Sequence, residues 1–182
     1  MSNWSPPTIT TERLVIRPMT VADLKDVHLF TSAYSAQRYG NWLGGTDPAS
    51  VARYMADTVA RYGRPPRCDL GVTFNRQLIG GLAFRQVWLS PPAIEVGWVL
   101  HPDMAGKGLA TEAVRALLEY LAEAFPDVSR FEARVHARDE GARKVLGRLN
   151  FQVEGVLRGG VDSEGNSADS SMYGLLRDEL RA

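Results

Sequence analysis

The segment from Val99 to Ala113 reads Val-Leu-His-Pro-Asp-Met-Ala-Gly-Lys-Gly-Leu-Ala-Thr-Glu-Ala. An apolar strand is expected before it and an apolar helix after it, with Gly106 and Gly108 in the turn between them. The first amides of a helix have no partner inside the helix, and the helix dipole favours a negative charge at this end. Glycines also let a ligand approach the backbone closely. The pattern predicts a phosphate-binding turn, to which Lys107 could add a positive charge.

Four interpretations of this turn compete. A P-loop requires a glycine at the position of His101 and a Ser or Thr after the lysine, and neither is present. A dinucleotide-binding turn requires a third glycine where Thr111 stands, and a shorter gap after the strand. A glycine-rich helix cap needs no ligand. The fourth interpretation fits best, because Asp103-Met-Ala-Gly-Lys-Gly108 resembles the acetyl-CoA signature of the GNAT N-acetyltransferases, (Arg/Gln)-x-x-Gly-x-(Gly/Ala), with Asp103 replacing the Arg or Gln.

Outward from this turn, hydrophobic periodicity predicts a mixed α/β chain. Asp47-Pro48 is a typical helix start, with an N-cap residue and a proline at the first helical position. The expected order is a strand over 9–19, helices after Thr20 and Asp47, strands over 70–74, 78–84 and 94–100, a helix over 107–124, a strand over 131–136, a helix over 139–149, and strands over 151–157 and 170–176. This order predicts a seven-stranded, largely antiparallel sheet around one βαβ-like crossover, flanked by about four helices.

The resemblance to GNAT enzymes extends over nearly the whole chain. It is carried by Thr11–Pro18, Gln77–Gly80, Glu95–Trp98, the signature at 103–108, Ala137–Phe151 and Glu154–Arg158. The ordered set is similar to the RimJ/RimL branch of the superfamily. It implies a single domain over residues 1–182 and a splayed sheet, in which strand 94–100 separates from strand 131–136.

The resemblance also implies which residues contact acetyl-CoA. The pantetheine arm would pair with the exposed backbone of Val99 and Leu100, beside Trp98. The pyrophosphate would lie on the turn and the first helical turn, at Gly106, Lys107, Gly108, Leu109, Ala110 and Thr111. Asp139 stands where the family usually has an asparagine that hydrogen-bonds the cofactor. An ionised Asp can still accept a hydrogen bond there but cannot donate one.

Glu95 is the candidate general base. It alternates with Gly97 and Val99 along an otherwise apolar strand. A carboxylate is uncommon in such a strand unless it has a partner or a function. It could draw a proton from an incoming amine through water, or it could face solvent or form a salt bridge.

The general acid has no assignment, because many GNAT enzymes place a tyrosine where this chain has Leu146. Ser171 and Tyr173 are possible donors on the last strand. Two further departures from the family are Ala142 in place of a serine and Asn150 in place of a glycine. Asn is the residue that best replaces glycine at positive φ.

Tyr39 and Trp42 are the candidate acceptor-binding residues, in a region that the family uses to cover the acceptor. They could equally anchor that region on the core. Deprotonating an α-amine at neutral pH costs about 1 kcal/mol, against about 4–5 kcal/mol for a lysine side chain. A single base candidate therefore favours an α-amine, such as a protein N-terminus. A small-molecule amine and a non-catalytic acyl-CoA-binding module are the alternatives.

The composition excludes further classes of function and kinds of site. Lys+Arg and Asp+Glu number 21 each. The chain therefore lacks the excess of basic residues that is typical of nucleic-acid-binding proteins. The chain has 1 cysteine, Cys68, which excludes an internal disulfide and a cysteine metal site. We expect Cys68 in the core, no bound metal and no covalent enzyme intermediate. No apolar run resembles a signal peptide or a membrane span. We expect a cytoplasmic protein without membrane contact, as a monomer or homodimer.

Overall fold

A computed structural model of the chain describes residues 5–32, 47–62, 67–161 and 167–181. The strands are β1 (Ile9–Thr10), β2 (Leu14–Pro18), β3 (Arg67–Phe74), β4 (Gln77–Leu89), β5 (Pro92–Leu100), β6 (Arg130–His136), β7 (Gln152–Val161) and β8 (Ser167–Leu176). The helices are α1 (Leu24–Ser32), α3 (Pro48–Arg61), α4 (Leu109–Ala124) and α5 (Glu140–Arg148), with short 3₁₀ turns η1 (Val21–Asp23), η2 (Pro102–Met104) and η3 (Arg177–Arg181). Among these residues, no helix is long and apolar enough to cross a membrane.

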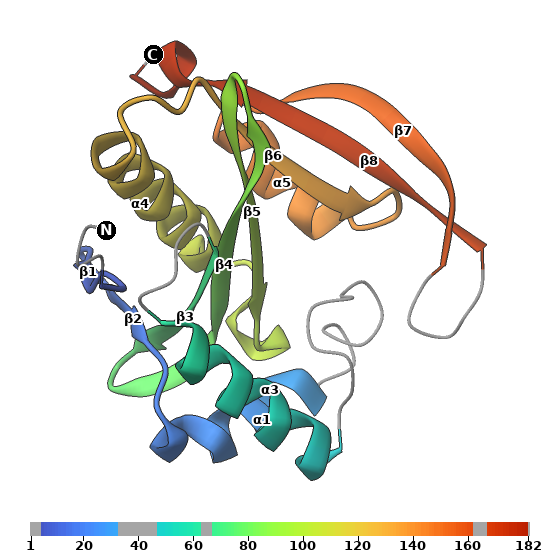
Figure 1. Ribbon diagram of the computed structural model, residues 1–182. Helices are drawn as coiled ribbons and strands as arrows, with labels where there is room; N and C mark the ends of the chain where they lie inside the picture. Colours follow the sequence, from blue (N-terminus) through green and yellow to red (C-terminus); the bar gives the residue numbers. More distant parts are fainter. Residues whose placement is uncertain (1–4, 33–46, 63–66, 162–166, 182) are drawn as a thin grey trace.

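The strands form one sheet in the order β1-β2-β3-β4-β5-β6-β8-β7 (Figure 1). The predicted mixed α/β class, the largely antiparallel sheet and the prediction of about four flanking helices are confirmed for the described residues. The prediction of seven strands is wrong, because the expected strand over 9–19 is two strands. The Thr11 amide donates to the Leu14 carbonyl at 2.9 Å, and the Leu14 amide donates to Thr11 Oγ1 at 2.9 Å. This turn folds Ile9 and Thr10 back onto β2, so the sheet has 8 strands.

The two faces of the sheet carry separate apolar clusters. Leu78 packs with α1 and α3 through Val27, Phe30, Val51 and Met55. The next residue, Ile79, packs into the larger cluster, which contains the buried faces of α4 and α5. Successive strand residues point to opposite faces of a sheet. The helices α1 and α3 therefore cover one face of β3 and β4, and α4 and α5 pack on the other (Figure 1).

One parallel pair interrupts the antiparallel order among the described strands. β5 and β6 pair in parallel at Ala93 with Arg130, Ile94 with Phe131 and Glu95 with Glu132. A parallel pair needs a crossover connection, and α4 supplies it. The ladder between β5 and β6 stops at Glu95, so the predicted separation of these two strands is confirmed.

The free half of β5 is held by β4 instead. The pairing between these strands continues to Gly80 and Leu100, and the His101 amide donates to the Ile79 carbonyl at 2.7 Å. Gly80 lies against β5 so closely that a Cβ atom there would collide with the carbonyl oxygen of Val99 and lie 2.8 Å from Leu100 Cα. The position of β5 beyond Glu95 thus depends on a residue without a side chain.

We predict that Gly80→Ala lowers the free energy of unfolding by about 1–3 kcal/mol, the usual cost of forcing extra volume into a packed site. Urea denaturation measures the change. Gly155→Ala in β7 is the matched control, because a Cβ atom there meets nothing within 4 Å. The control should stay within about 0.5 kcal/mol of the original protein. Equal losses for the two variants would show that close approach at Gly80 is not the cause.

Candidate functional site

The candidate site begins where β5 and β6 separate. Beyond Glu95, β5 pairs with β4, and beyond Glu132, β6 pairs with β8; within the described residues the two strands do not pair with each other again. Each strand therefore has an inner edge whose backbone groups no strand binds. Such an edge can accept an extended ligand by backbone hydrogen bonds.

The side chains of residues 98–100, along this edge, pack against the two apolar clusters. Trp98 and Leu100 are half-buried against the larger apolar cluster, and Val99 packs against the smaller one. Their backbone, rather than their side chains, is what the strand separation exposes. The cofactor contact of Val99 and Leu100 stays a prediction.

The glycine turn follows directly after β5 and η2. Gly106 and Gly108 have φ angles of 75° and 77°, a left-handed conformation that side chains disfavour. Gly108 is the N-cap of α4, and the first helical hydrogen bond runs from the Glu112 amide to the Gly108 carbonyl at 3.1 Å. The amides from Gly108 to Thr111 therefore have no partner within the helix. Helix α4 begins at Leu109, two residues after the predicted start at Lys107, because both glycines belong to the turn.

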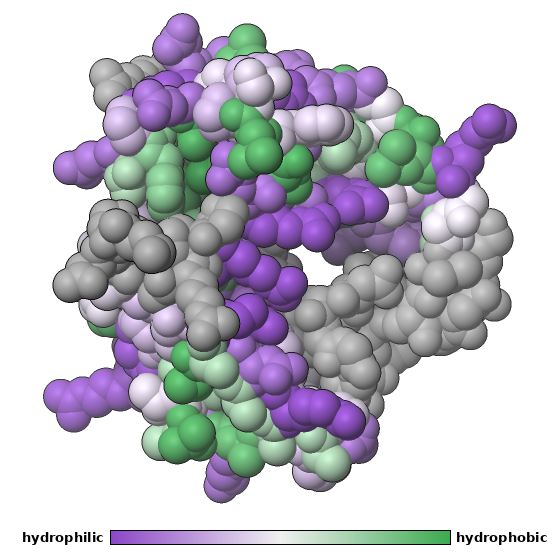
Figure 2. Space-filling view, in the orientation of Figure 1, coloured by the Kyte–Doolittle hydropathy of each residue, from purple (hydrophilic) through white to green (hydrophobic). Residues whose placement is uncertain are grey.

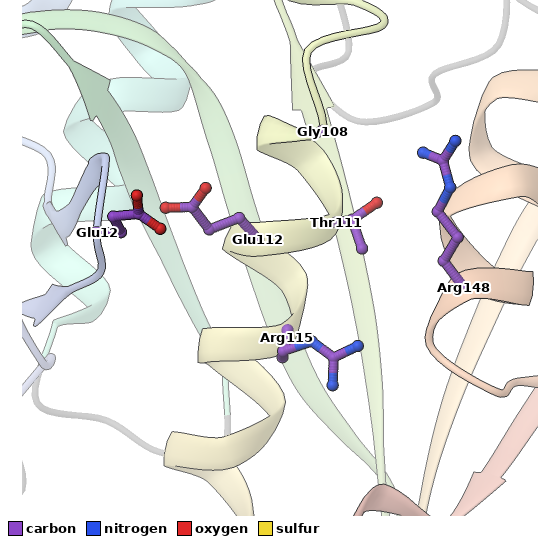
Figure 3. A pocket seen from close by; sticks show the side chains of 6 residues that line it. All are labelled: Glu12, Gly108, Thr111, Glu112, Arg115 and Arg148. Atoms are coloured by element: carbon purple, nitrogen blue, oxygen red, sulfur yellow. The ribbon is translucent and has the colours of Figure 1, made fainter.

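A pocket of about 390 Å³ adjoins this helix end. It is lined by Glu12, Gly108, Thr111, Glu112, Arg115 and Arg148 (Figure 3). Arg148 comes from α5 and faces the side of α4 that carries Thr111 and Arg115. Two guanidinium groups next to a helix N-terminus form a setting that favours an anion.

Thr111 carries an unsatisfied oxygen in this pocket. Its Oγ1 atom is buried and has no hydrogen-bond partner among the described residues. A threonine inside a helix often donates to the carbonyl four residues earlier, which here belongs to Lys107. That carbonyl instead accepts a hydrogen bond from Arg13 Nη1 at 3.0 Å. A buried hydroxyl without a partner is costly, and a ligand oxygen would satisfy it.

The first turn of α4 is tied to the turn between β1 and β2. Glu112 Oε1 accepts from Thr11 Oγ1 at 2.6 Å and from the Arg13 amide at 3.0 Å, while Oε2 lies 2.6 Å from Arg13 Nε and Nη2. Burial alone would raise the pKa of the Glu112 carboxyl. The hydrogen bonds from Thr11 and Arg13 outweigh burial and hold this pKa below its ordinary value.

Glu95 lies at the base of the strand separation, at the last position of β5 that pairs with β6. Its Oε2 atom is 2.8 Å from Arg85 Nη2 and 3.9 Å from Arg134 Nη2, and its side chain is 18% exposed. The sequence left Glu95 as either a base or a surface residue in a salt bridge, and the structure contains the salt bridge. Figure 2 shows hydrophilic residues across the middle of one face of the molecule. The role of Glu95 as a base stays a prediction.

Other residues singled out in the sequence have clear structural roles. Asp139 is the N-cap of α5, with Oδ1 accepting from the Ala142 amide at 2.9 Å. Asn150 has a φ angle of 64°, as expected for a residue that replaces glycine. Leu146, Ser171 and Tyr173 are buried, so none of the three presents an acid to solvent.

Cys68 is buried in the core, as predicted. Burial, and secondarily the charge of Asp69, raises the pKa of its thiol to about 12. The thiolate is therefore scarce at neutral pH, which makes Cys68 a poor nucleophile. In the part of the chain that the structure describes, no three histidine, cysteine or carboxylate side chains gather as metal ligands do.

Two residues that the sequence predicts for the acceptor site are not described by the structure, and two residues that line the pocket were not predicted. Tyr39 and Trp42 lie outside the described residues. Arg115 and Arg148 were not predicted as site residues. Arg115 follows Thr111 by four residues, a spacing that places both on one helix face, so periodicity could have found it. Arg148 reaches the pocket only through the packing of α5 beside α4.

The sequence has relatives among the acetyltransferases. Residues 13–152 match the family model described as acetyltransferase (GNAT) domain. The chain is 31% identical to the uncharacterized N-acetyltransferase p20 of Bacillus licheniformis, over 94% of this chain and 97% of that protein. It is 28% identical to the putative ribosomal N-acetyltransferase YdaF of Bacillus subtilis, over 79% of this chain and 80% of that protein.

The fold also has a solved counterpart. RimL, a ribosomal L7/L12 α-N-protein acetyltransferase in complex with coenzyme A, is similar with a TM-score of 0.83. The likeness covers 95% of this chain and 99% of RimL, at 19% sequence identity. At that identity the likeness shows the fold alone.

The lowered pKa of Glu112 generates a prediction about stability and pH. A carboxyl whose pKa is depressed by folding stabilises the native state above its unfolded pKa of about 4.3, and this contribution is lost as the pH falls through the folded pKa. We expect Glu112→Gln to be less stable than the original protein at pH 7. The difference should shrink steadily below about pH 4.3.

Denaturant midpoints measured between pH 7 and pH 3 test this expectation. Glu140→Gln is the control, because Glu140 is exposed and its ion pair with Lys144 spans 4.0 Å. The control should follow the original protein at every pH. A Glu112→Gln difference that does not change with pH would contradict the role of the ionised carboxylate.

Proposed function

The chain belongs to the GNAT acetyltransferase family, and we propose that it transfers an acetyl group from acetyl-CoA to the α-amine of a protein N-terminus. The observation that carries the proposal is that β5, with its unpaired inner edge, leads through the glycine turn directly to the pocket at the start of α4. A strand edge can bind an amide-rich arm, and the helix end can bind a phosphate. Acetyl-CoA has both groups.

The residues present fit acetyl-CoA. The amides from Gly108 to Thr111 would hold the pyrophosphate, and the unsatisfied Thr111 Oγ1 could donate to it. Gly106 and Lys107, with Leu109 and Ala110, complete the predicted turn, and Arg115 and Arg148 add positive charge beside it. When bound, acetyl-CoA supplies the acetyl group as an activated thioester.

The remaining predicted contacts concern the other parts of the cofactor. The backbone of Val99 and Leu100 would pair with the pantetheine arm, beside Trp98, because β6 does not occupy that edge. Asp139 would have to contact the cofactor while its Oδ1 atom caps α5. These assignments rest on the family resemblance and on the geometry of β5 and α5.

Glu95 is the proposed base. The acceptor amine must lose its proton before it can attack, and for an α-amine this costs about 1 kcal/mol at neutral pH. Arg85 and Arg134 approach the same carboxylate oxygen and hold the carboxylate where the β5–β6 ladder ends. Glu95 would take the proton directly or through one water, at the point where β5 and β6 separate.

Transfer is proposed to proceed by direct attack of the amine on the thioester. Cys68 cannot serve as an intermediate carrier, because it is buried and its pKa is raised. The tyrosine that many GNAT enzymes use as an acid is replaced by the buried Leu146. The leaving group is a thiolate, which is much less basic than an alkoxide, so transfer needs little help from an acid.

Chemistry and the names of two relatives support a protein N-terminus as the acceptor. A single base with no acid suits an α-amine better than a lysine side chain. Two similar proteins, YdaF and RimL, are named for ribosomal or α-N-protein acetylation. Tyr39 and Trp42 are proposed to cover this acceptor, as the sequence predicts. A cytoplasmic location suits the same acceptor.

The test is acetyl transfer measured as free thiol release from acetyl-CoA. The acceptors are short peptides with free N-termini, the same peptides with blocked N-termini and an internal lysine, and small amines such as polyamines and amino sugars. The proposal expects thiol release with free N-termini only. Activity confined to small amines would favour a small-molecule acetyltransferase. Binding of acetyl-CoA without transfer to any amine would favour a non-catalytic binding module.

We predict that Gly108→Ala weakens CoA binding at least tenfold. A side chain at a φ of 77° costs about 1–2 kcal/mol, so the turn would shift to relieve the strain and misplace the amides. Isothermal titration with CoA measures the change. Gly159→Ala is the matched control, because Gly159 has a φ of 78° but lies in β7. A control variant that weakens CoA as much as Gly108→Ala would overturn the phosphate-binding role of the turn.

We predict that Glu95→Gln lowers kcat by about 10²–10⁴-fold, the usual contribution of a positioned base. The dissociation constant for CoA should stay within about twofold, since the carboxylate is not needed to bind the cofactor. Steady-state kinetics with the identified acceptor measure kcat, and Glu140→Gln serves as a surface control. A fall of less than about threefold would mean that Glu95 acts only through its ion pair with Arg85.

A further inference from the structure

The turn between β1 and β2 carries an arginine that none of the roles above uses. Arg13 places Nε and Nη2 2.6 Å from Glu112 Oε2, and Nη1 donates to the Lys107 carbonyl at 3.0 Å. Arg13 thus bridges a carboxylate on the first turn of α4 and a backbone carbonyl of the glycine turn. It belongs to the Thr11–Pro18 segment, which the family resemblance includes but to which no function has been assigned.

The hydrogen bond to Lys107 determines how one peptide group is turned. In a planar trans peptide the carbonyl and the following N–H point in opposite directions. Because the Lys107 carbonyl points toward Arg13, the Gly108 N–H points away from the β1–β2 turn. In Figure 3, Glu112, which Arg13 contacts, projects from α4 on one side, and Thr111 projects on the side of Arg148. The Gly108 N–H is therefore directed away from the side of Arg13 and Glu112.

This peptide group needs a restraint. Gly106 and Gly108 flank Lys107, and both have positive φ angles. Glycine visits several backbone conformations at similar cost, so the plane between Lys107 and Gly108 could reorient easily. The same hydrogen bond turns the Lys107 carbonyl toward Arg13, and Thr111 Oγ1, which could donate to that carbonyl from within the helix, is buried without a partner among the described residues. Arg13 thus affects two groups that face the pocket.

We infer that Arg13 is a positioning residue for the phosphate-binding turn. It holds the Lys107–Gly108 peptide so that the Gly108 amide faces the pyrophosphate of acetyl-CoA, and it leaves the Thr111 hydroxyl available to the same ligand. The inference rests on the proposed use of acetyl-CoA. It adds a residue of the first strands, far from the signature in sequence, to the groups that determine cofactor affinity.

The alternative role for Arg13 is purely structural, as an anchor between the β1–β2 turn and α4. Arg17 offers a matched control for that role. Its guanidinium donates to both carboxylate oxygens of Asp23, at 2.9 and 2.7 Å, and to the Pro18 carbonyl at 3.0 Å. Each arginine thus pairs with one carboxylate and one backbone carbonyl. Arg17 has no contact with the glycine turn.

The experiment compares Arg13→Gln and Arg17→Gln by melting temperature, by CoA titration and by hydrogen exchange of residues 105–112. Both variants should melt at lower temperature. Only Arg13→Gln should raise the Kd for CoA, by about tenfold if the correct peptide orientation falls to about a tenth of the population. Only Arg13→Gln should speed exchange in the glycine turn. With an active acceptor, KM for acetyl-CoA should rise while KM for the acceptor is unchanged.

Two results would overturn the inference. One is an unchanged Kd for CoA in folded Arg13→Gln, and the other is equal weakening by both variants, which would indicate a general loss of stability. Failure of the original protein to bind CoA would contradict the proposed function and the inference with it, and is distinguishable because no variant is involved. If Arg13→Gln does not fold, Arg13→Lys replaces it. A single ammonium can keep the ion pair with Glu112 but lacks the guanidinium fork needed to bridge both partners, so the Kd should still rise.

Discussion

The separation of β5 from β6 is the constraint on which the candidate site depends. A parallel pair can be joined only through a crossover, and α4 forms that crossover within a sheet that is otherwise antiparallel. The pair ends at Glu95 and Glu132. From there β5 follows β4, because Gly80 permits close contact, and β6 follows β8. The separation of the two strands thus exposes a strand edge, places a carboxylate at its base and directs the chain into the glycine turn.

Charge is arranged differently at the two ends of this path. At the glycine turn, Arg13 pairs with Glu112, and the pocket beside the helix end carries two guanidinium groups, on Arg115 and Arg148, against one further carboxylate, on Glu12. At the base of the separation, a carboxylate is paired with two arginines. The first arrangement suits the proposed binding of phosphate, and the second holds the proposed base in place. The two functions are therefore separated in space as well as in chemistry.

Local patterns were sufficient to predict most elements. The Asp47 N-cap accepts from the Ala49 and Ser50 amides, as the Asp47-Pro48 signal indicates. The one strand predicted over 9–19 failed because the Thr11 hydroxyl competes for the Leu14 amide and reverses the chain. Alternating apolar residues do not report such a side-chain bond, since the pattern is the same on both sides of the turn.

The sequence by itself determined the helix-opening glycines, the neutral charge balance, the single cysteine and the family resemblance. These are properties of one segment or of the whole composition, and periodicity and turn chemistry act over a few residues. Only the tertiary structure decided that Arg148 shares a pocket with Thr111, that Arg13 contacts Lys107 and that Glu95 pairs with Arg85 and Arg134. Arg13 and Lys107 are 94 positions apart. Contacts at that distance depend on how the sheet and helices pack, and no local pattern encodes which distant side chain fills a given hydrogen bond.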